Sequence, residues 1–349
     1  MASQRIVIVT GAGASRNLGA KGELPLMADW AGILVEDVDK AEPGLARAIG
    51  LSSELGAQEF EEIIGSFLSW QGALGLVQRF VTVGGPDPNS RYGDTEAWLN
   101  NSRRRAAAFT EALRTSLYRE FGREAIDAEA ASKAHRRFRM LLGDDAIFVY
   151  ATTNYDVSIE VGLRGAGFNP HDGFAQVGWE SPVLSLDDLI DWDNAHASRE
   201  PVLHLHGAVG WYRQSDGRIV RQFPDQPYNP TLGSPVVLPP DPNKDPVSDS
   251  SVALIWDRFR AALRGATHIL VVGHSLNDTP LVNVLREASA NAHLAVTHRP
   301  DDDDSSERIY RLFPGDKVRA IPMRFGPDLE TDADLVNQWL GQEPIRHLV

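Results

Sequence analysis

Residues 5–15 read Arg-Ile-Val-Ile-Val-Thr-Gly-Ala-Gly-Ala-Ser, and this stretch decides the fold class. Its first part, Arg5–Thr10, is short, apolar and β-branched and ends at a glycine, which predicts a buried strand of the parallel type. Similar runs are Ala146–Ala151, Pro201–Leu205, His268–Val272, Leu294–Thr297 and, more weakly, Val318–Met323. Because segments with helical periodicity separate several of these runs, we predict an α/β fold with a doubly wound parallel sheet.

The predicted strands are unevenly spaced. About 135 residues separate Thr10 from Ala146, whereas a simple strand–helix–strand unit needs only a few dozen. The interval 43–143 carries apolar residues at helical spacing, so we interpret it as a helical module inserted after the first strand. The arginine clusters Arg103–Arg105 and Arg136–Arg137 lie in it. They allow two interpretations, a solvated helix face or a surface that contacts a partner or a phosphate.

The composition is that of a soluble globular protein, with 42% hydrophobic and 23% charged residues. A formal net charge of −14 argues against direct nucleic-acid binding, for which a basic surface supplies most of the affinity. Since the sequence has no cysteine and no HExxH pattern, we expect neither a disulfide nor a metal site. Without a targeting signal or an apolar stretch of roughly 18 residues, we expect a cytoplasmic protein with no membrane contact.

The loop Gly11–Ser15 directly follows the first predicted strand. Glycine lets a backbone turn sharply and come close to a phosphate, so the loop is a candidate nucleotide site. The fingerprint GxGxxG is not met, because Arg16 stands where the third glycine would be. For the loop taken alone, the alternative is a tight turn without a ligand.

Polar residues follow two more predicted strands. Thr152–Asp156 (TTNYD) follows the second strand, and Gly273–Asp278 (GHSLND) follows the run that ends at Val272. Ligands of open α/β sheets bind beyond the carboxyl ends of the strands, so both segments are candidate binding elements. The structural alternatives are a helix N-cap at Thr153 or Asn154, and an ordinary turn with an Asn or Asp cap in the second segment.

The fourth candidate is the end of Pro201–Leu205, where His204 and His206 precede Gly207. Strand alternation puts both imidazoles on one face. A neutral imidazole accepts a proton near neutral pH, so His206 is a candidate general base. The alternative is a hydrogen-bonded histidine of the core, and it is the stronger interpretation for His204. The segment Val209–Asp249 is rich in Pro, Asp and Asn and predicts a long excursion with little regular structure.

In this order, the four segments resemble the sirtuin superfamily, whose members bind NAD and break its nicotinamide–ribose bond. Gly11–Ser15 is similar to the GAG-S loop, and Thr152–Asp156 to the T-x-N-x-D segment with Tyr155 for the usual Ile. His206-Gly207 is similar to the His-Gly pair of that family. Gly273–Leu276 is similar to its G-T-S-L turn, although a histidine replaces the threonine.

The resemblance implies a Rossmann-like sheet. Residues 1–349 are then a single sirtuin-like NAD-binding domain, with residues 43–143 as the helical module within it. It also implies roles for three side chains: Asn154 orients the ribose and the attacking water, His206 is the general base, and Asp156 binds the nicotinamide amide. The residues expected to bind NAD are Gly11, Ala12, Gly13, Ala14, Ser15, Thr153, Tyr155, Gly273, His274 and Ser275.

The departures from the family pattern narrow the expected activity. Deacylating sirtuins carry a four-cysteine zinc module and a G-I-P-D-F-R segment, whereas this chain has no cysteine and reads GAKGELPLMADW over residues 19–30. With its helical insertion, the chain resembles a bacterial branch that is associated with antiphage defence and hydrolyses NAD to nicotinamide and ADP-ribose. The alternatives are a non-catalytic NAD or ADP-ribose sensor, a protein deacylase or ADP-ribosyltransferase, and an unrelated nucleotide-binding scaffold.

An NAD hydrolase that was always active would kill its cell, so the resemblance also implies that the activity is gated. Homo-oligomerisation is one expected means of gating. A separate partner protein, such as an ATPase or an Argonaute-like protein, is the other.

Overall fold

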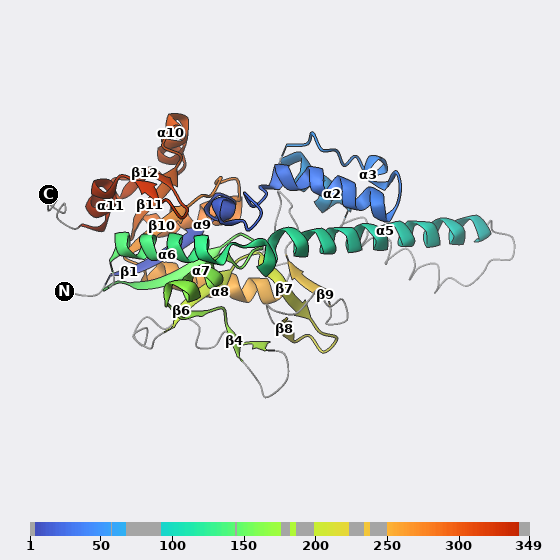
Figure 1. Cartoon of the computed structure of the whole chain (residues 1–349), viewed down its shortest axis with the longest axis horizontal. Helices are drawn as coiled ribbons and strands as arrows, with labels where there is room; N and C mark the ends of the chain where they lie inside the picture. Colours follow the sequence, from blue (N-terminus) through green and yellow to red (C-terminus); the bar gives the residue numbers. More distant parts are fainter. Residues whose placement is uncertain are drawn as a thin grey trace. The chain divides into compact units, whose positions relative to one another are not determined.

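The computed structural model of the chain describes residues 4–56, 58–67, 92–143, 145–175, 182–185, 199–222, 234–237 and 250–341 (Figure 1). The chain divides into two compact units. The first falls within Met1–Leu24, Glu120–Leu238 and Asp245–Val349, and the described part of the second falls within Pro25–Arg119. All four segments that predict the NAD site belong to the first unit.

The first unit is built on a sheet of eight described strands. Their spatial order is β13 (Glu330–Thr331), β12 (Val318–Arg324), β11 (His293–His298), β10 (His268–Val272), β1 (Arg5–Thr10), β2 (Ile147–Thr152), β6 (Glu200–His204) and β3 (Pro170–His171). Neighbouring strands are parallel except β12 and β13, which are antiparallel. The predicted strands agree with the observed bounds to within one residue, and the Rossmann-like, doubly wound fold class is confirmed.

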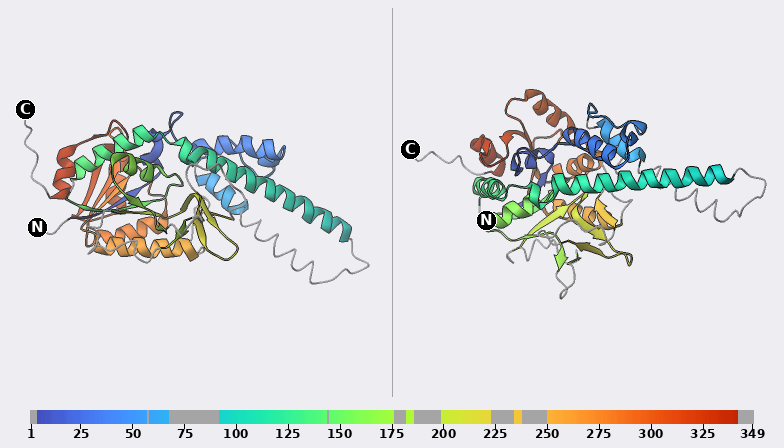
Figure 2. Two further views of the ribbon diagram at one scale, coloured as in Figure 1. Left: turned by 60° about the horizontal axis from the view of Figure 1, so that its bottom comes forward. Right: turned by 45° about the vertical axis from the view of Figure 1, so that its right-hand side comes forward.

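Helices cover both faces of this sheet, which the left view of Figure 2 shows. One face carries α8 (Ser250–Gly265), α9 (Thr279–Ser289) and α10 (Asp303–Leu312), and the other carries α6 (Ala128–Leu142), α7 (Ser158–Ala166) and α11 (Ala333–Leu340). Along β1, Val7 and Val9 pack toward the first face while Ile6 and Ile8 pack toward the second. Because both faces are covered, the strand is apolar from Ile6 to Val9 instead of alternating with polar residues.

The first unit also contains the short helical elements α1 (Ala12–Ser15) and the 3-10 turns Arg16–Leu18 and Arg123–Ala125. A second, antiparallel sheet has the order β4 (Phe174–Ala175), β5 (Val183–Leu184), β8 (Ile219–Arg221), β7 (Gly207–Arg213) and β9 (Ser234–Val237). The prediction of little regular structure over Val209–Asp249 is therefore wrong for the described residues. Trp211 and Tyr212 are buried and form a strand, because short aromatic and β-branched runs lie between the Pro- and Asp-rich stretches.

The second unit is helical, as predicted for the insertion after the first strand. It contains α2 (Met27–Ala41), α3 (Leu45–Ala48), helical residues 58–67 and most of α5 (Tyr92–Phe121). Trp30 lies at its centre, edge-on to Phe60 with ring centroids 5.5 Å apart, and its indole N–H donates to Ser116 Oγ at 2.8 Å. The predicted module, residues 43–143, overlaps this unit over 43–119, whereas α6 packs on the sheet of the first unit.

The arginine clusters lie on helix faces and form ion pairs. Arg104 binds Glu42 through two hydrogen bonds of 2.9 and 3.0 Å, and the Arg105 Nε lies 3.7 Å from the same carboxylate. Arg137 lies 3.5 Å from Asp328. These contacts support the interpretation as solvated helix faces. Within the described part of the chain, no helix is long and apolar enough to cross a membrane.

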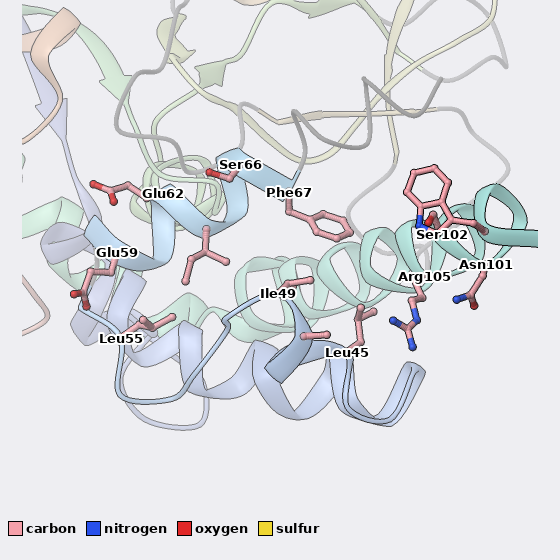
Figure 3. A pocket seen from close by; sticks show the side chains of 13 residues that line it. Leu45, Ile49, Leu55, Glu59, Glu62, Ser66, Phe67, Asn101, Ser102 and Arg105 are labelled. Atoms are coloured by element: carbon pink, nitrogen blue, oxygen red, sulfur yellow. The ribbon is translucent and has the colours of Figure 1, made fainter. Parts of the chain in front are cut away.

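The second unit also contains a pocket of about 900 Å³. Figure 3 shows Glu59 and Glu62 at one end and Arg105 at the other, with apolar side chains such as Leu45 and Ile49 between them. None of the residues predicted to bind NAD lines this pocket. It is therefore a feature of the helical unit and separate from the predicted NAD site.

Candidate functional site

The four predicted segments follow four neighbouring parallel strands, in the order β10, β1, β2 and β6. Parallel strands end at the same edge of a sheet, so the segments share one edge. The chain passes from β1 to β2 on one side and from β10 to β11 on the other, so the strand order reverses between β1 and β10. Open α/β sheets bind ligands at such a reversal. The loop after β1 and the turn after β10 lie on its two sides.

The glycines of the loop after β1 allow it to contact the turn after β10. Gly11 N donates to Val272 O at 3.0 Å, and Gly13 N donates to Gly273 O at 2.9 Å. A Cβ atom at Gly11 would lie 2.8 Å from Gly273 O, and one at Gly13 would lie 2.9 Å from the same atom. Glycine is thus required here for contact between the two segments, in addition to the predicted approach of a phosphate.

The turn after β10 holds an unusual backbone conformation. Gly273 has φ +62°, and Leu276 has φ +59°, a region that costs a non-glycine residue about 1–2 kcal/mol. The Leu276 side chain is buried in the core, and its N–H donates to His274 Nδ1 at 2.8 Å. Burial and this hydrogen bond hold the strained turn. Strain that the surroundings maintain is typical of ligand sites.

Asn154 ties the segment after β2 to the glycine loop. Its side-chain amide donates to Gly11 O at 3.0 Å and to Ser15 Oγ at 2.9 Å. The Ser15 hydroxyl in turn donates to Asp156 Oδ1 at 3.2 Å and lies 2.9 Å from Ser158 Oγ. The structure therefore brings the predicted residues Gly11, Ser15, Asn154 and Asp156 into one hydrogen-bonded network.

Asp156 lies at the buried end of this network. Its burial raises the pKa of the carboxyl group, while hydrogen bonds from Ser158 and Ser15 offset part of that effect. Asp156 Oδ1 accepts from Ser158 N at 2.9 Å, at the first turn of α7. Helix α7 begins at Ser158 with Val157 as N-cap, so the alternative of a helix N-cap at Thr153 or Asn154 is wrong.

Two other predicted residues have mainly structural contacts. Thr153 N donates to Thr10 O at 3.1 Å, which continues the pairing of β1 and β2 beyond their ends. Tyr155 is 4% exposed and packs edge-on against Phe121 with ring centroids 6.2 Å apart. By contrast, Ala12, Gly13 and Ser275 are exposed at the edge.

His206 pairs with a carboxylate from the turn after β10. Its Nε2 lies 2.9 Å from Asp278 Oδ2, and both side chains are buried. Because a carboxylate only accepts hydrogen bonds, Nε2 is the donor. Gly207, the next residue, has φ +74°, and a Cβ atom there would lie 2.0 Å from Val236 O of β9. The His-Gly pair is therefore held tightly at this edge.

His204 has a different partner. Its Nε2 donates to Glu160 Oε1 of α7 at 2.6 Å, and the imidazole is completely buried. Burial by itself would lower the pKa of His204 and raise that of Glu160, but their mutual attraction and hydrogen bond reverse both directions. The pKa of His204 is thus raised and that of Glu160 lowered, as in an ion pair. The interpretation of His204 as a hydrogen-bonded core histidine is confirmed.

Three residues of this region have no predicted role beyond local structure: Ser158, Glu160 and Asp278. Asp278 was expected only as a cap, and it does cap α9, since its Oδ1 accepts from Leu281 N at 3.0 Å. In the sequence, the one indication of its hydrogen bond with His206 is that a polar cluster follows β10, as polar residues also follow β2 and β6. Ser158 and Glu160 follow the TTNYD segment directly, and nothing in their local pattern separates them from an ordinary first helical turn.

The described residues contain no group of three or more His, Cys, Asp or Glu side chains that could hold a metal ion. The family model of the SIR2-like domain matches residues 149–319. This domain is associated with NAD-dependent enzymes, which agrees with the site at the reversal of strand order. No curated protein matches the chain.

The matched range contains three of the four segments, with Asn154, His206 and Gly273. The loop Gly11–Ser15 lies outside it. Its link to the matched range rests on the hydrogen bonds from Gly13 to Gly273 and from Asn154 to Gly11.

Proposed function

We propose that this chain is an NAD glycohydrolase that converts NAD and water into nicotinamide, ADP-ribose and a proton. The observation that carries the proposal is the convergence of Asn154, His206 and the glycine loop at one strand edge of a SIR2-like domain. The bond between ribose C1′ and the cationic pyridinium nitrogen breaks, and its electron pair stays on nicotinamide. The oxygen of water then bonds to C1′.

The proposed roles follow the hydrogen-bonded network. Asn154 bridges the loop after β1 and the segment after β2, and we assign it the role of orienting the ribose and the attacking water. His206 takes the proton from that water or from a ribose hydroxyl, a step that typically contributes about 10²- to 10⁴-fold to the rate. Asp156, buried beside Ser15, accepts the hydrogen bond of the nicotinamide amide. The loop Gly11–Ser15 and the turn Gly273–Ser275 bind the rest of NAD.

Hydrolysis is favoured over deacylation because the sequence has no cysteine. A four-cysteine zinc module, on which the acyl-lysine cleft of deacylating sirtuins depends, cannot be built from it. We further propose that the enzyme acts in antiphage defence and is gated by homo-oligomerisation or by a separate partner protein. An activity that destroys NAD must be restrained in a healthy cell.

The test is chromatographic measurement of nicotinamide released from NAD by the purified chain. His206→Ala and Asn154→Ala should each lower the release at least about 100-fold. His293→Ala serves as the control, because His293 is exposed at the amino end of β11, far from the carboxyl edge of the strands. Wild-type rates in both site variants would sink the assignment. Binding of NAD without release by the wild type would instead favour the sensor.

A further inference from the structure

We propose that Asp278 is the positioning residue of His206. Its carboxylate fixes the ring of the proposed base and stabilises the positive charge that the ring gains when it takes a proton. The inference rests on the proposed function, because it assigns a role in the same site. The hydrogen bond between His206 and Asp278 links the end of β6 to the turn after β10, although β6 and β10 are not neighbours in the sheet.

The two oxygens of Asp278 have different partners. Oδ1 accepts from Leu281 N at 3.0 Å, in the first turn of α9, and Oδ2 accepts from His206 Nε2 at 2.9 Å. The first bond ties the carboxylate to the helix, so the direction of Oδ2 is fixed as well. The side chains of His206 and Asp278 are 3% and 7% exposed. With little water to compete, a hydrogen bond there is stronger than at the surface.

Helix capping alone does not account for this arrangement. Aspartates also cap α6, α10 and α11, where Asp127, Asp302 and Asp332 accept hydrogen bonds from the backbone of their own first turns. Among these four described caps, Asp278 is the one for which a histidine from another strand end is a partner. The second bond therefore reflects a requirement of the site.

The backbone around His206 is held independently of Asp278. The Trp256 indole N–H of α8 donates to Leu205 O at 2.8 Å, one residue before the histidine. One residue after it, Gly207 packs against Val236 O. The backbone is thus fixed on both sides. What Asp278 adds is control of the rotation of the imidazole ring.

The pairing also determines which nitrogen of the His206 ring exchanges protons in the proposed reaction. In such a pair the nitrogen that faces the carboxylate keeps its proton, and the other ring nitrogen exchanges protons with the substrate. Here Nε2 faces Asp278, so Nδ1 takes the proton of the attacking water. The ring becomes an imidazolium beside a carboxylate that stays ionised. When ADP-ribose leaves, Nδ1 returns the proton to solvent.

The first test compares Asp278→Asn with Asp332→Asn. Asparagine caps helices about as well as aspartate, and its amide oxygen still accepts a hydrogen bond from His206 Nε2, so we expect both variants to fold. We expect kcat to fall about 100-fold in Asp278→Asn with KM within about twofold of the wild type, because a neutral amide does not stabilise the imidazolium. Asp332→Asn should keep the wild-type kcat. An unchanged kcat in Asp278→Asn overturns the proposal.

The second test does not depend on activity. In ¹⁵N-labelled protein, the ring signals of His206 are assigned by their loss in His206→Ala. We expect an Nε2–H proton at low field in the wild type and in Asp332→Asn, and its shift to higher field in Asp278→Asn. If the wild type releases no nicotinamide, the proposed function fails while this signal still tests the pairing. A signal that Asp278→Asn leaves unmoved overturns the inference.

Discussion

His204 and His206 stand two residues apart, and each forms a buried hydrogen bond with a carboxylate. The partner of His204 is Glu160, within a helix that covers one face of the sheet. The partner of His206 is Asp278, the cap of a helix that begins at the carboxyl edge. The chemical pairs are nearly the same, but only the second joins two of the segments predicted to contact NAD.

The difference teaches that the partner's location decides what a histidine–carboxylate pair does. The pair of His204 and Glu160 is enclosed on all sides, so its charges contribute to the fold and have no access to a substrate. The pair of His206 and Asp278 joins two segments that end beyond the strands. We therefore expect damage to the first pair to reduce stability and damage to the second to reduce turnover.

The largest expected effect tests the first pair. Glu160→Gln leaves His204 without its charged partner in a buried position, which typically costs about 3–5 kcal/mol. Denaturant unfolding should detect this loss, while nicotinamide release by the folded fraction should stay within about threefold of the wild type. Glu287→Gln, at an exposed position of α9, is the control and should change neither quantity. A Glu160→Gln protein that folds but releases no nicotinamide would contradict the prediction that the first pair serves stability and the second serves turnover.

A smaller effect is expected when Leu205, the residue between the two histidines, loses its hydrogen bond from Trp256. Trp256→Phe removes the N–H that binds Leu205 O and leaves a buried carbonyl unpaired, at a cost of about 1–3 kcal/mol. Because Leu205 lies between His204 and His206, we expect both a lower free energy of unfolding and a several-fold loss of turnover. Trp339→Phe is the matched control, since it removes an indole bond to His293 O. Equal turnover in the two variants would contradict the prediction.

The smallest effect is the pH dependence of the first pair. The pKa of Glu160 lies below its usual 4.5, so its stabilising charge is present above pH 4.5 and lost as the pH falls through the lowered pKa. The pKa of His204 lies above its usual 6.5, so its contribution is complete below pH 6.5 and lost as the pH rises through the raised pKa.

The difference in unfolding free energy between wild type and Glu160→Gln should therefore be greatest between pH 4.5 and 6.5. It should shrink on either side of that window. Urea titrations at half-unit steps of pH measure the profile. A difference that does not vary with pH would mean that the pair is not ionised.

Local patterns in the sequence predicted much of this molecule. Six of the eight described strands of the larger sheet were predictable because each is an apolar run bounded by turn residues, as in His268–Val272. The two-residue strands β3 and β13 were not predicted. The candidate segments were predictable because their polar residues follow strand ends, where ligands of α/β sheets bind. The hydrogen bond from Gly13 to Gly273 was not predicted, because it depends on β1 and β10 being neighbours in the sheet.

The sequence also did not show which charged side chains pair with each other. His206 and Asp278 are separated by 72 residues and follow two strands, β6 and β10, that are not adjacent, so no periodicity indicates their contact. Tyr155 shows a different limit of prediction from the sequence. It lies inside a segment predicted to bind NAD, yet its side chain is buried in the core and does not face the edge of the sheet. The strand β7 was missed because the composition of its surroundings outweighed a short aromatic run.

The central place of β1 in the sheet has a consequence for synthesis of the protein on the ribosome. This strand is translated before its neighbours β2 and β10, which end only at Thr152 and Val272. At typical rates of translation, β10 emerges on the order of tens of seconds after β1. Until then the carboxyl edge lacks the Gly273 turn and Asp278. A nascent chain therefore cannot carry the assembled candidate site until β10 and the turn after it have been translated.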